Sequence, residues 1–465
     1  MSTTGDHFII GTIVHALSID ELQIINKGYL AVNQGEIIGI GDASSIECPL
    51  KYIATHGLNC VVTNLTDTQF IMPGFVDCHI HAPQMPNIGL GLGLPLLDWL
   101  DTFTFPLESE YKNIDFASKV YDTVVRRTLK CGTTTASYFA TIHKESSLAL
   151  ARACVEQGQR AFIGKVNMNS QIPSYYREDT YDSIQDTKDV INSIARMNST
   201  LVKPTITPRF ALSCDMHLMN ELSKIAKQHD LNIQSHISEN KSEVKAVAKA
   251  YPKNTSYANV YDEAELLTNK TIMAHGVYLT DEELIILKQR GTSVAHCPSS
   301  NTNLASGLCN VRRLLKAGLT VGLGTDISGG NTCMILDVMR RAIDVSQHLS
   351  FLKSDDIVCP GEMIIAEQSP LTYANAIYLA TLGGAEALSL HSKIGNFVVG
   401  KKFDAILIDI FAHGSPIDKF EFTSELSAKI EPDENVKISN YIQKFVLVGD
   451  ERNIVKVFVD GRQVK

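Results

Sequence analysis

The residues FIMPGFVDCHIH, at positions 70–81, form an apolar run that ends in two histidines. A short apolar run of this kind predicts a buried strand. Side chains two positions apart face the same side of a strand, so His79 and His81 can both project from its carboxyl end. Two imidazoles placed in this way can share one metal ion, although an H-x-H pair alone is weak evidence for a metal site.

Seven more apolar runs follow, and helical patterns such as FASKVYDTVVRRTLKCG separate them. The runs are GTTTASYFA, RAFIGKVNM, VKPTITPRF, LNIQSHISE, TIMAHG, TSVAHCP and LTVGLGTD. This alternation predicts parallel β-α units, and eight such units can close into a (β/α)8 TIM-type barrel. An open doubly wound sheet is the alternative. We disfavour it because no G-x-G-x-x-G follows an early strand and because polar residues gather at the ends of many strands.

The sequences at both ends of the chain are typical of β-strands. The N-terminal runs FIIGTIVHAL, GYLAVNQGEIIGIG and CVVTNL carry no long helix, and FDAILIDI and IVKVFVDGRQV return to strand texture near the C-terminus. Two helical stretches, MILDVMRRAIDVSQHLSFL and YANAIYLATLGGAEAL, precede that return. We therefore expect an α/β protein with a barrel at 70–390 and a smaller β-sandwich domain formed by 1–69 and 391–465.

The amino-acid composition favours a globular protein and argues against several other classes. The hydrophobic fraction of 44% indicates a globular chain with a large core, and the net charge of −9 argues against a nucleic-acid-binding surface. None of the ten cysteines forms a C-x-x-C pair, so free thiols are favoured over disulfides. No secretory signal and no membrane span is visible, so we expect a cytoplasmic protein.

Polar residues close several of the later runs. His236, His275 and His296 end three of them, and Asp326 ends LTVGLGTD. In a barrel all such strand ends meet at one mouth, where active sites of this architecture lie. Imidazoles with a carboxylate form a ligand set suited to Zn²⁺, with Fe²⁺ as a substitute, and His79, His81 and His236 can supply the three imidazoles.

The remaining strand-end residues have compatible chemical roles. Asp326 can be a weak metal ligand and the general base for a metal-bound water, and His275 can hydrogen-bond the resulting hydroxide. Glu239 can carry a proton to the substrate, although a carboxylate at the start of a helix in SENKSEV is an equal reading. His296 has the least support. Neither H-E-x-x-H nor the paired motifs of cytidine-type deaminases occur, which excludes those two zinc classes.

The motifs PGFVDCHIH, SHISE, MAHG, AHCPSSN and LGTD, in this order, resemble the amidohydrolase superfamily. The resemblance spans nearly the whole chain and includes IGNFVVGKKFDAILID, which is similar to the strand that returns to the small β domain. The fourth run ends in TPRF, without the lysine of the binuclear branches. The mononuclear deaminase and chlorohydrolase branch therefore fits better.

Within that branch, HAPQ, LPLLDWLDTFTFPLE, VVRRTLKCGTTTASYFATIH and KPTITPRFALSC resemble the eukaryotic guanine deaminase family. The resemblance implies a zinc-dependent homodimer of purine catabolism, in which a metal-bound hydroxide attacks C2 of guanine to give xanthine and ammonia. It implies one zinc per chain on His79, His81, His236 and Asp326, and catalysis by Glu239, Asp326 and His275. The implied contacts to guanine come from His81, Gln84, Arg209, Phe210, His236, Glu239 and Asp326.

The implied chemistry is coherent. Attack at C2 builds negative charge on the neighbouring N3, which an acid at Glu239 would neutralise. Arg209 offers fixed donors for a carbonyl or ring acceptor, and Phe210 offers an apolar face. The glycine-rich loop after Gln84 leaves the fit of the substrate open. Two alternatives remain, namely a deaminase or chlorohydrolase acting on another heterocycle, and a scaffold that has lost catalysis.

Overall fold

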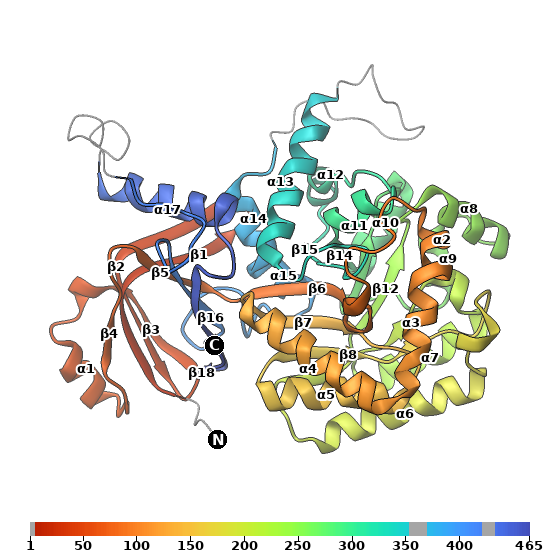
Figure 1. Cartoon of the computed structure of the whole chain (residues 1–465), viewed down its shortest axis with the longest axis horizontal. Coiled ribbons are helices and arrows are strands. Elements are labelled where there is room, and N and C mark those ends of the chain that lie inside the picture. Colours follow the sequence, from red (N-terminus) through yellow and green to blue (C-terminus); the bar gives the residue numbers. More distant parts are fainter. Residues whose placement is uncertain (1–4, 353–369, 421–432) are drawn as a thin grey trace.

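The computed structural model describes residues 5–352, 370–420 and 433–465 (Figure 1). One of the ten cysteines, Cys359, lies outside these residues, and the nine that are described are free thiols. None of the helices in the described ranges is long and apolar enough to cross a membrane.

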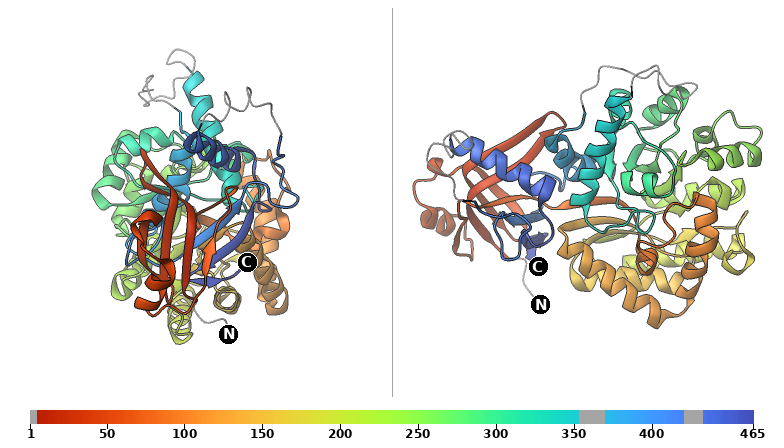
Figure 2. Two further views of the ribbon diagram at one scale, coloured as in Figure 1. Left: turned by 90° about the vertical axis from the view of Figure 1, so that its left-hand side faces the viewer. Right: turned by 45° about the horizontal axis from the view of Figure 1, so that its top comes forward.

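The two ends of the chain build one sheet together. Its order is β18-β17-β16-β5-β1-β2-β3, and β4 pairs with β1. In Figures 1 and 2 the red N-terminal strands and the blue C-terminal strands lie side by side in this sheet. The strands are β1 (His7–Ser18), β2 (Glu21–Asn33), β3 (Glu36–Asp42), β4 (Val62–Asn64), β5 (Gln69–Pro73), β16 (Ala405–Asp409), β17 (Ile454–Val459) and β18 (Arg462–Gln463).

All eight runs expected as parallel strands contain a strand, in the expected order. They are β6 (Phe75–His81), β7 (Thr133–Phe139), β8 (Arg160–Gly164), β10 (Val202–Pro204), β12 (Ile233–Ile237), β13 (Thr271–His275), β14 (Ser293–His296) and β15 (Val321–Leu323). Two short strands, β9 (Val166–Asn167) and β11 (Thr207–Pro208), follow β8 and β10 and pair with each other. Every pairing among these strands is parallel.

The parallel ladders come in groups. One sheet has the order β10-β8-β7-β6 and another has β12-β13-β14-β15, and a bridge between Ile206 and Ile233 connects the two halves. Within the described ranges, no ladder joins β15 to β6. The backbone N–H of Asp326 nevertheless donates to the carbonyl of His79 over 2.8 Å, so the two outer strands lie next to each other.

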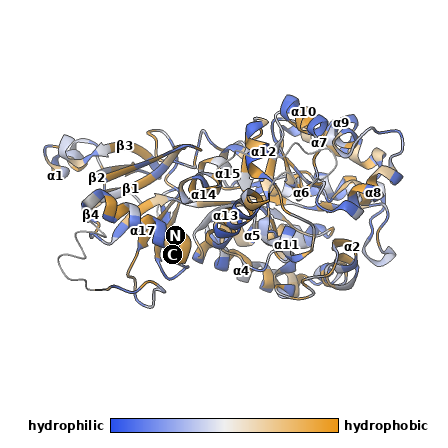
Figure 3. Ribbon diagram, turned by 90° about the horizontal axis from the view of Figure 1, so that it is seen from above, coloured by the Kyte–Doolittle hydropathy of each residue, from blue (hydrophilic) through white to orange (hydrophobic). Residues whose placement is uncertain are grey.

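Helices follow the parallel strands and cover them. They are α4 (Ile114–Lys130), α5 (Lys144–Gln157), α6 (Thr180–Arg196), α7 (Met216–His229), α8 (Lys241–Ala250), α9 (Tyr257–Glu263), α10 (Asp281–Arg290), α11 (Pro298–Asn303), α12 (Val311–Lys316), α13 (Ile335–Phe351), α14 (Tyr373–Ala380) and α15 (Leu382–Ala387). A further helix, α17 (Glu434–Val448), lies between β16 and β17 of the terminal sheet and contacts α13 and α14. Outer helices such as α9 and α10 mix hydrophilic and hydrophobic residues in Figure 3, as amphipathic helices on a core do.

Local sequence sets several helix ends. The Asn113 side chain accepts from the N–H of Phe116 at the start of α4, and Thr280 with Glu283 forms a capping box at the start of α10. Gly158 ends α5 with φ 78°, a left-handed conformation that glycine adopts without strain.

Three expectations need correction. The run at 70–81 is two strands, β5 in the terminal sheet and β6 among the parallel strands, separated by Gly74. A Cβ at Gly74 would lie 2.2 Å from the Thr134 side chain, so only glycine allows the chain to cross there. The stretch YANAIYLATLGGAEAL is two helices, because Thr381 breaks the helix with φ −127° and ψ −89°. Finally, α17 has no counterpart among the expected helices.

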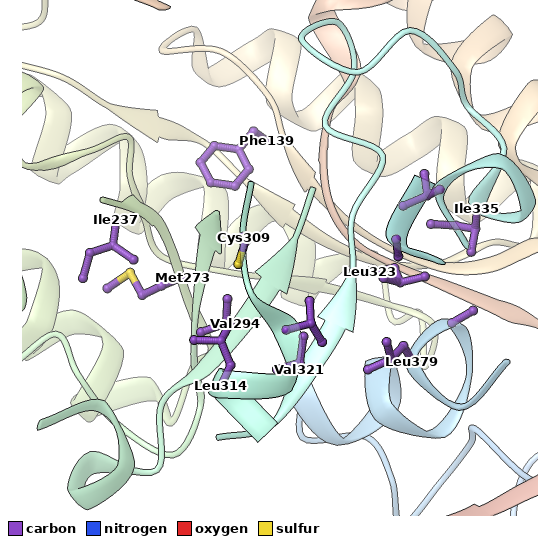
Figure 4. Close-up of a cluster of buried hydrophobic side chains, with 14 of the residues drawn as sticks. Phe139, Ile237, Met273, Val294, Cys309, Leu314, Val321, Leu323, Ile335 and Leu379 are labelled. Atoms are coloured by element: carbon purple, nitrogen blue, oxygen red, sulfur yellow. The ribbon is translucent and has the colours of Figure 1, made fainter. Parts of the chain in front are cut away.

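A large apolar core lies beneath the second group of parallel strands. Figure 4 shows Met273, Val294, Val321 and Leu323 from β13 to β15, with Leu314, Ile335 and Leu379 from the helices packed on them. These strands are buried on both faces, as expected for parallel strands between helices and a filled interior. The rigid core fixes the positions of the strand ends, where the polar residues lie.

Candidate metal and substrate site

The strand ends bring four predicted ligands together. His79 and His81 lie at the end of β6, His236 lies on β12, and Asp326 follows β15. All four side chains are buried, and one ligand atom from each lies within 4.8 Å of those of the others. The group has the composition of a mononuclear site with three imidazoles and one carboxylate.

The distances within this group are short. His79 Nε2 lies 3.2 Å from Asp326 Oδ1, and His81 Nε2 lies 3.5 Å from the same oxygen. His81 Nε2 also faces His236 Nε2 at 3.1 Å. His79 Nε2 is buried and makes no hydrogen bond of good geometry. Buried ring nitrogens that converge in this way are suited to a shared cation.

Surrounding groups orient the ligands. His236 Nδ1 donates to the carbonyl of Arg209 over 2.5 Å, which leaves Nε2 of that ring as the lone-pair nitrogen facing the cluster. The Phe139 ring of β7 packs against His79, His81 and His236, with ring centroids 4.5–5.0 Å apart. These contacts hold the three imidazoles in place before any ligand binds.

The electrostatics keep the imidazoles neutral and the carboxylate charged. Burial, followed by the neighbouring His79, holds the pKa values of His81 and His236 well below their usual range. Burial alone would raise the pKa of Asp326, but its contacts with His79 and His275 outweigh burial and bring that pKa well below its ordinary value. Metal binding requires neutral imidazole and ionised carboxylate, so the cluster is prepared for a cation.

The loop that carries Asp326 is held from β6. Asp77 is fully buried and accepts hydrogen bonds from the N–H and hydroxyl of Thr325, at 3.0 and 2.5 Å. Asp326 itself has φ 48°, and His275 at the end of β13 has φ 76°. Left-handed backbone at non-glycine residues costs about 1–3 kcal/mol and is concentrated at functional sites.

Glu239 and His275 lie beside the cluster. His275 Nε2 is 3.3 Å from Glu239 Oε2 and 3.8 Å from Asp326 Oδ2, and His275 Nδ1 pairs with Asn301 Oδ1 at 2.9 Å. Glu239 lies in the loop before α8, outside the helix, and its Oε1 accepts from Ser306 at 3.3 Å. Burial, together with the charge of Asp326, raises the pKa of Glu239 well above its usual value and so favours the protonated form of this carboxyl.

A pocket opens directly onto this cluster. Its empty volume is about 410 Å³, including space open to solvent. The lining residues are His81, Gln84, Leu96, Trp99, Leu100, Arg209, Phe210, His236, Glu239, Glu243, His275, Leu304, Asp326 and Gly329. Gln84, Arg209 and Phe210 therefore lie on the same cavity as the four candidate ligands.

The predicted residues thus share one site, with one exception. His296 ends β14 as expected and is fully buried, but it belongs neither to the four-residue ligand group nor to the pocket lining. Burial lowers its pKa to about 3, so it is a neutral imidazole within the interior.

Several residues of the site are missing from the sequence-based set. Glu243 and Trp99 line the pocket, Asp77 holds Thr325, and Phe139 packs on the ligand rings. Glu108 receives hydrogen bonds from two of the pocket residues. Asp77 carried a signal in its spacing, since it lies two positions before His79 on the same strand. Trp99, Glu108 and Phe139 lie in segments that carry the family resemblance, but no spacing marked them as site residues.

Comparisons with known proteins agree with this geometry. Residues 70–464 match the model of the amidohydrolase family. The chain is 46% identical over 463 residues to guanine deaminase of Homo sapiens, covering 98% of this chain and 96% of that one. It is 30% identical over 444 residues to guanine deaminase of Escherichia coli, covering 95% and 92%.

A solved structure of guanine deaminase from C. acetobutylicum with bound guanine in the active site is also similar. It has a TM-score of 0.86 and 33% identity, and the match covers 99% of this chain and 100% of that one. The fold and the buried site define a hydrolase of α/β architecture. The chain belongs to the amidohydrolase family.

Proposed function

We propose that this chain hydrolyses guanine to xanthine and ammonia and acts in purine catabolism. The observation that carries the proposal is the similarity to guanine deaminases over nearly the full length of the chain. A pocket lined by hydrogen-bond donors and by an apolar ring, next to a buried His/Asp cluster, supports it independently.

We infer that His79, His81, His236 and Asp326 hold one Zn²⁺. Three neutral imidazoles and an ionised carboxylate match the preferences of zinc, and the ring nitrogens that converge on this cluster fit this role. When bound, the ion supplies Lewis-acid activation of water. Fe²⁺ suits the same donors less specifically, and elemental analysis distinguishes the two metals.

The proposed proton transfers use two carboxyl groups in opposite states. The ionised Asp326 accepts a proton from the attacking water as its oxygen bonds to C2 of guanine. The neutral Glu239 donates its proton to N3, where negative charge would otherwise build. The proton on Asp326 then passes to the amino group, the C2–N bond breaks and ammonia leaves. The remaining hydroxyl proton passes to Glu239 as C2 becomes a carbonyl carbon, which restores both carboxyl groups to their starting states. His275 lies within 3.8 Å of both carboxylates and orients them.

The opposite wall of the pocket holds the purine in this proposal. Gln84 and Arg209 offer N–H donors to its carbonyl and ring acceptors, and Phe210 packs against its face. His81, His236, Glu239 and Asp326 contact the reacting end. This assignment places the amino-bearing carbon at the cluster and the carbonyl end at the donors.

We also infer the finer architecture. The short separation of Asp326 and His79 supports closure of the eight β-α units into a barrel. Because β5 belongs to the terminal sheet, this barrel begins after Gly74 and not at residue 70. A small β-sandwich domain, formed by the two ends of the chain, is supported by one apolar cluster that combines Ile9 and Leu30 with Phe403 and Phe458. We further propose a cytoplasmic homodimer.

The decisive experiment is a guanine-to-xanthine absorbance assay on the purified chain. We expect guanine turnover, about one zinc ion per chain, loss of activity with a chelator and recovery on addition of Zn²⁺. Adenine, cytosine and a triazine, tested in parallel, address the second candidate, a related deaminase or chlorohydrolase acting on another heterocycle. Tightly bound metal without guanine turnover would contradict the proposed function.

A further inference from the structure

A buried carboxylate lies behind the donor wall of the pocket. Glu108 lies on α3 (Phe105–Ser109), the short helix that follows α2 (Leu96–Trp99) and a further helical turn, and its side chain is fully buried. We propose that Glu108 is a positioning residue that orients Arg209 and Gln84 as a matched pair of donors for the substrate's carbonyl oxygen. This inference rests on the proposed function, since it assigns a role in binding guanine.

Glu108 receives four hydrogen bonds from three side chains. Its Oε1 accepts from Gln84 Nε2 at 2.8 Å and from an Arg209 terminal nitrogen at 3.1 Å. Its Oε2 accepts from the other Arg209 terminal nitrogen at 2.6 Å and from the hydroxyl of Tyr176 at 2.8 Å. Both carboxylate oxygens are therefore fully used, and each is fixed by two donors.

The arrangement fixes the plane of Arg209. A bidentate carboxylate holds both terminal nitrogens, and the Phe105 ring lies 5.2 Å from the guanidinium carbon. Burial opposes the charged form, but the attraction of Glu108 outweighs it and raises the pKa of the guanidinium above its ordinary value. A guanidinium has five N–H donors, so three remain for other acceptors, including a ligand in the pocket.

Gln84 is fixed at both ends of its amide. Nε2 donates to Glu108, and Oε1 accepts from the backbone N–H of Ser328 at 2.9 Å. The carbonyl end is thereby occupied, and the remaining hydrogen on Nε2 is a donor. Arg209 and Gln84 therefore both present N–H donors to the pocket. These donors can hydrogen-bond to a carbonyl oxygen of the substrate, but they would be left without a partner beside a ring position that has no acceptor.

Stability alone does not explain the buried ion pair between Glu108 and Arg209. Burying both charges costs several kcal/mol per ion, and well-packed apolar residues often do as well or better. What a buried carboxylate adds here is orientation, since one side chain fixes two pocket residues from separate segments, Gln84 after β6 and Arg209 after β11. The expected consequence of removing it is loss of substrate binding, with the chemistry at C2 preserved.

Glu108→Gln tests this role, because it keeps the size of the side chain and replaces one acceptor oxygen with a donor. We expect KM for guanine to rise about 10- to 100-fold, while kcat changes less than about threefold and zinc content stays the same. The inhibition constant of 2-aminopurine, which lacks the carbonyl, should change less than about threefold. A variant that loses affinity for both purines equally, or that keeps its KM for guanine, would overturn the inference.

Two further variants complete the test. Glu110→Gln changes an exposed glutamate two positions away and should leave all constants unchanged. Tyr176→Phe removes one donor to Glu108 without changing any charge, so it decides the question if Glu108→Gln does not fold. We expect KM to rise about two- to fivefold with kcat unchanged, and an unchanged KM would count against Glu108.

The outcome is separable from the proposed function. A wild-type chain without guanine turnover would remove the proposed function whatever the variants do. An active wild-type chain with an unaffected Glu108→Gln variant would remove only the inference about Glu108.

Discussion

Buried polar side chains behave differently in two regions of the molecule, the mouth formed by the parallel strand ends and the terminal sheet. In the terminal sheet, both ring nitrogens of His15 have partners, since Nε2 pairs with Gln23 at 2.8 Å and Nδ1 accepts from the N–H of Phe397 at 3.3 Å. At the mouth, buried nitrogens of His79, His81 and His275 have no hydrogen-bond partner within the described residues.

The carboxylates differ in the same way. Asp404, at the start of β16, accepts two hydrogen bonds from Arg160 at 2.9 and 3.0 Å and one from the N–H of Asp460. Asp326, at the mouth, faces only imidazoles that share it. Leaving buried polar groups unpaired costs about 1–3 kcal/mol each, so we infer that the mouth reserves them for a ligand while the sheet uses its polar groups for stability.

Asp326→Asn gives the strongest test of the difference between the mouth and the terminal sheet. We expect kcat/KM for guanine to fall about 10⁴-fold at saturating Zn²⁺, because the variant loses the ionised proton acceptor. The measurement is steady-state turnover, with elemental analysis to separate loss of metal from loss of chemistry. If more than a tenth of the activity remained with metal bound, Asp326 would not be the base.

Glu239→Gln should have the next largest effect. The substitution removes the proton that burial keeps on this carboxyl, so kcat should fall about 10³-fold while zinc content is unchanged. Glu282→Gln, on the exposed face of α10, is the matched control and should keep full activity. Parallel losses of zinc and activity in Glu239→Gln would assign this residue to the metal site instead.

The same contrast explains what could be predicted from sequence. Strand-end residues such as His236 and Asp326 were predictable because each closes an apolar run, and parallel strands end on the same side. Glu108 was not, because its segment consists of short helical turns with no period, and its contacts to Gln84 and Arg209 join positions 24 and 101 residues away.

The fold, too, could be predicted from sequence only where the pattern is local. Periodicity identified the eight parallel strands, since each is a buried run between amphipathic helices. It could not show that the chain changes sheets at Gly74, because the reason is a close approach of Thr134 from another part of the chain. Such long-range contacts leave no local pattern in the sequence.

Asp404→Asn tests the other half of the comparison. Removing one charge of a buried ion pair leaves Arg160 uncompensated, so we expect the free energy of unfolding to fall by about 3–5 kcal/mol. Turnover per folded molecule should stay within about twofold of wild type, because the pair is absent from the pocket lining. Urea unfolding measures the first quantity, and Asp418→Asn, at an exposed position, is the control.

A smaller effect should come from His15 as pH falls. Burial lowers the pKa of His15 in the folded chain to about 4, below the value of about 6.5 for an unfolded histidine. The unfolded state therefore binds the proton first, so this residue costs no stability above pH 6.5 and progressively more as pH falls toward 4.

His15→Gln removes that titration. Between pH 7 and pH 4.5, the free energy of unfolding of the variant should fall by about 2–3 kcal/mol less than that of the wild type, measured by urea unfolding. His413→Gln, at an exposed histidine, should follow the wild-type curve. If His15→Gln also followed that curve, the pH dependence would originate at other titrating groups, and the fully partnered imidazole of the sheet would not be the acid-sensitive one.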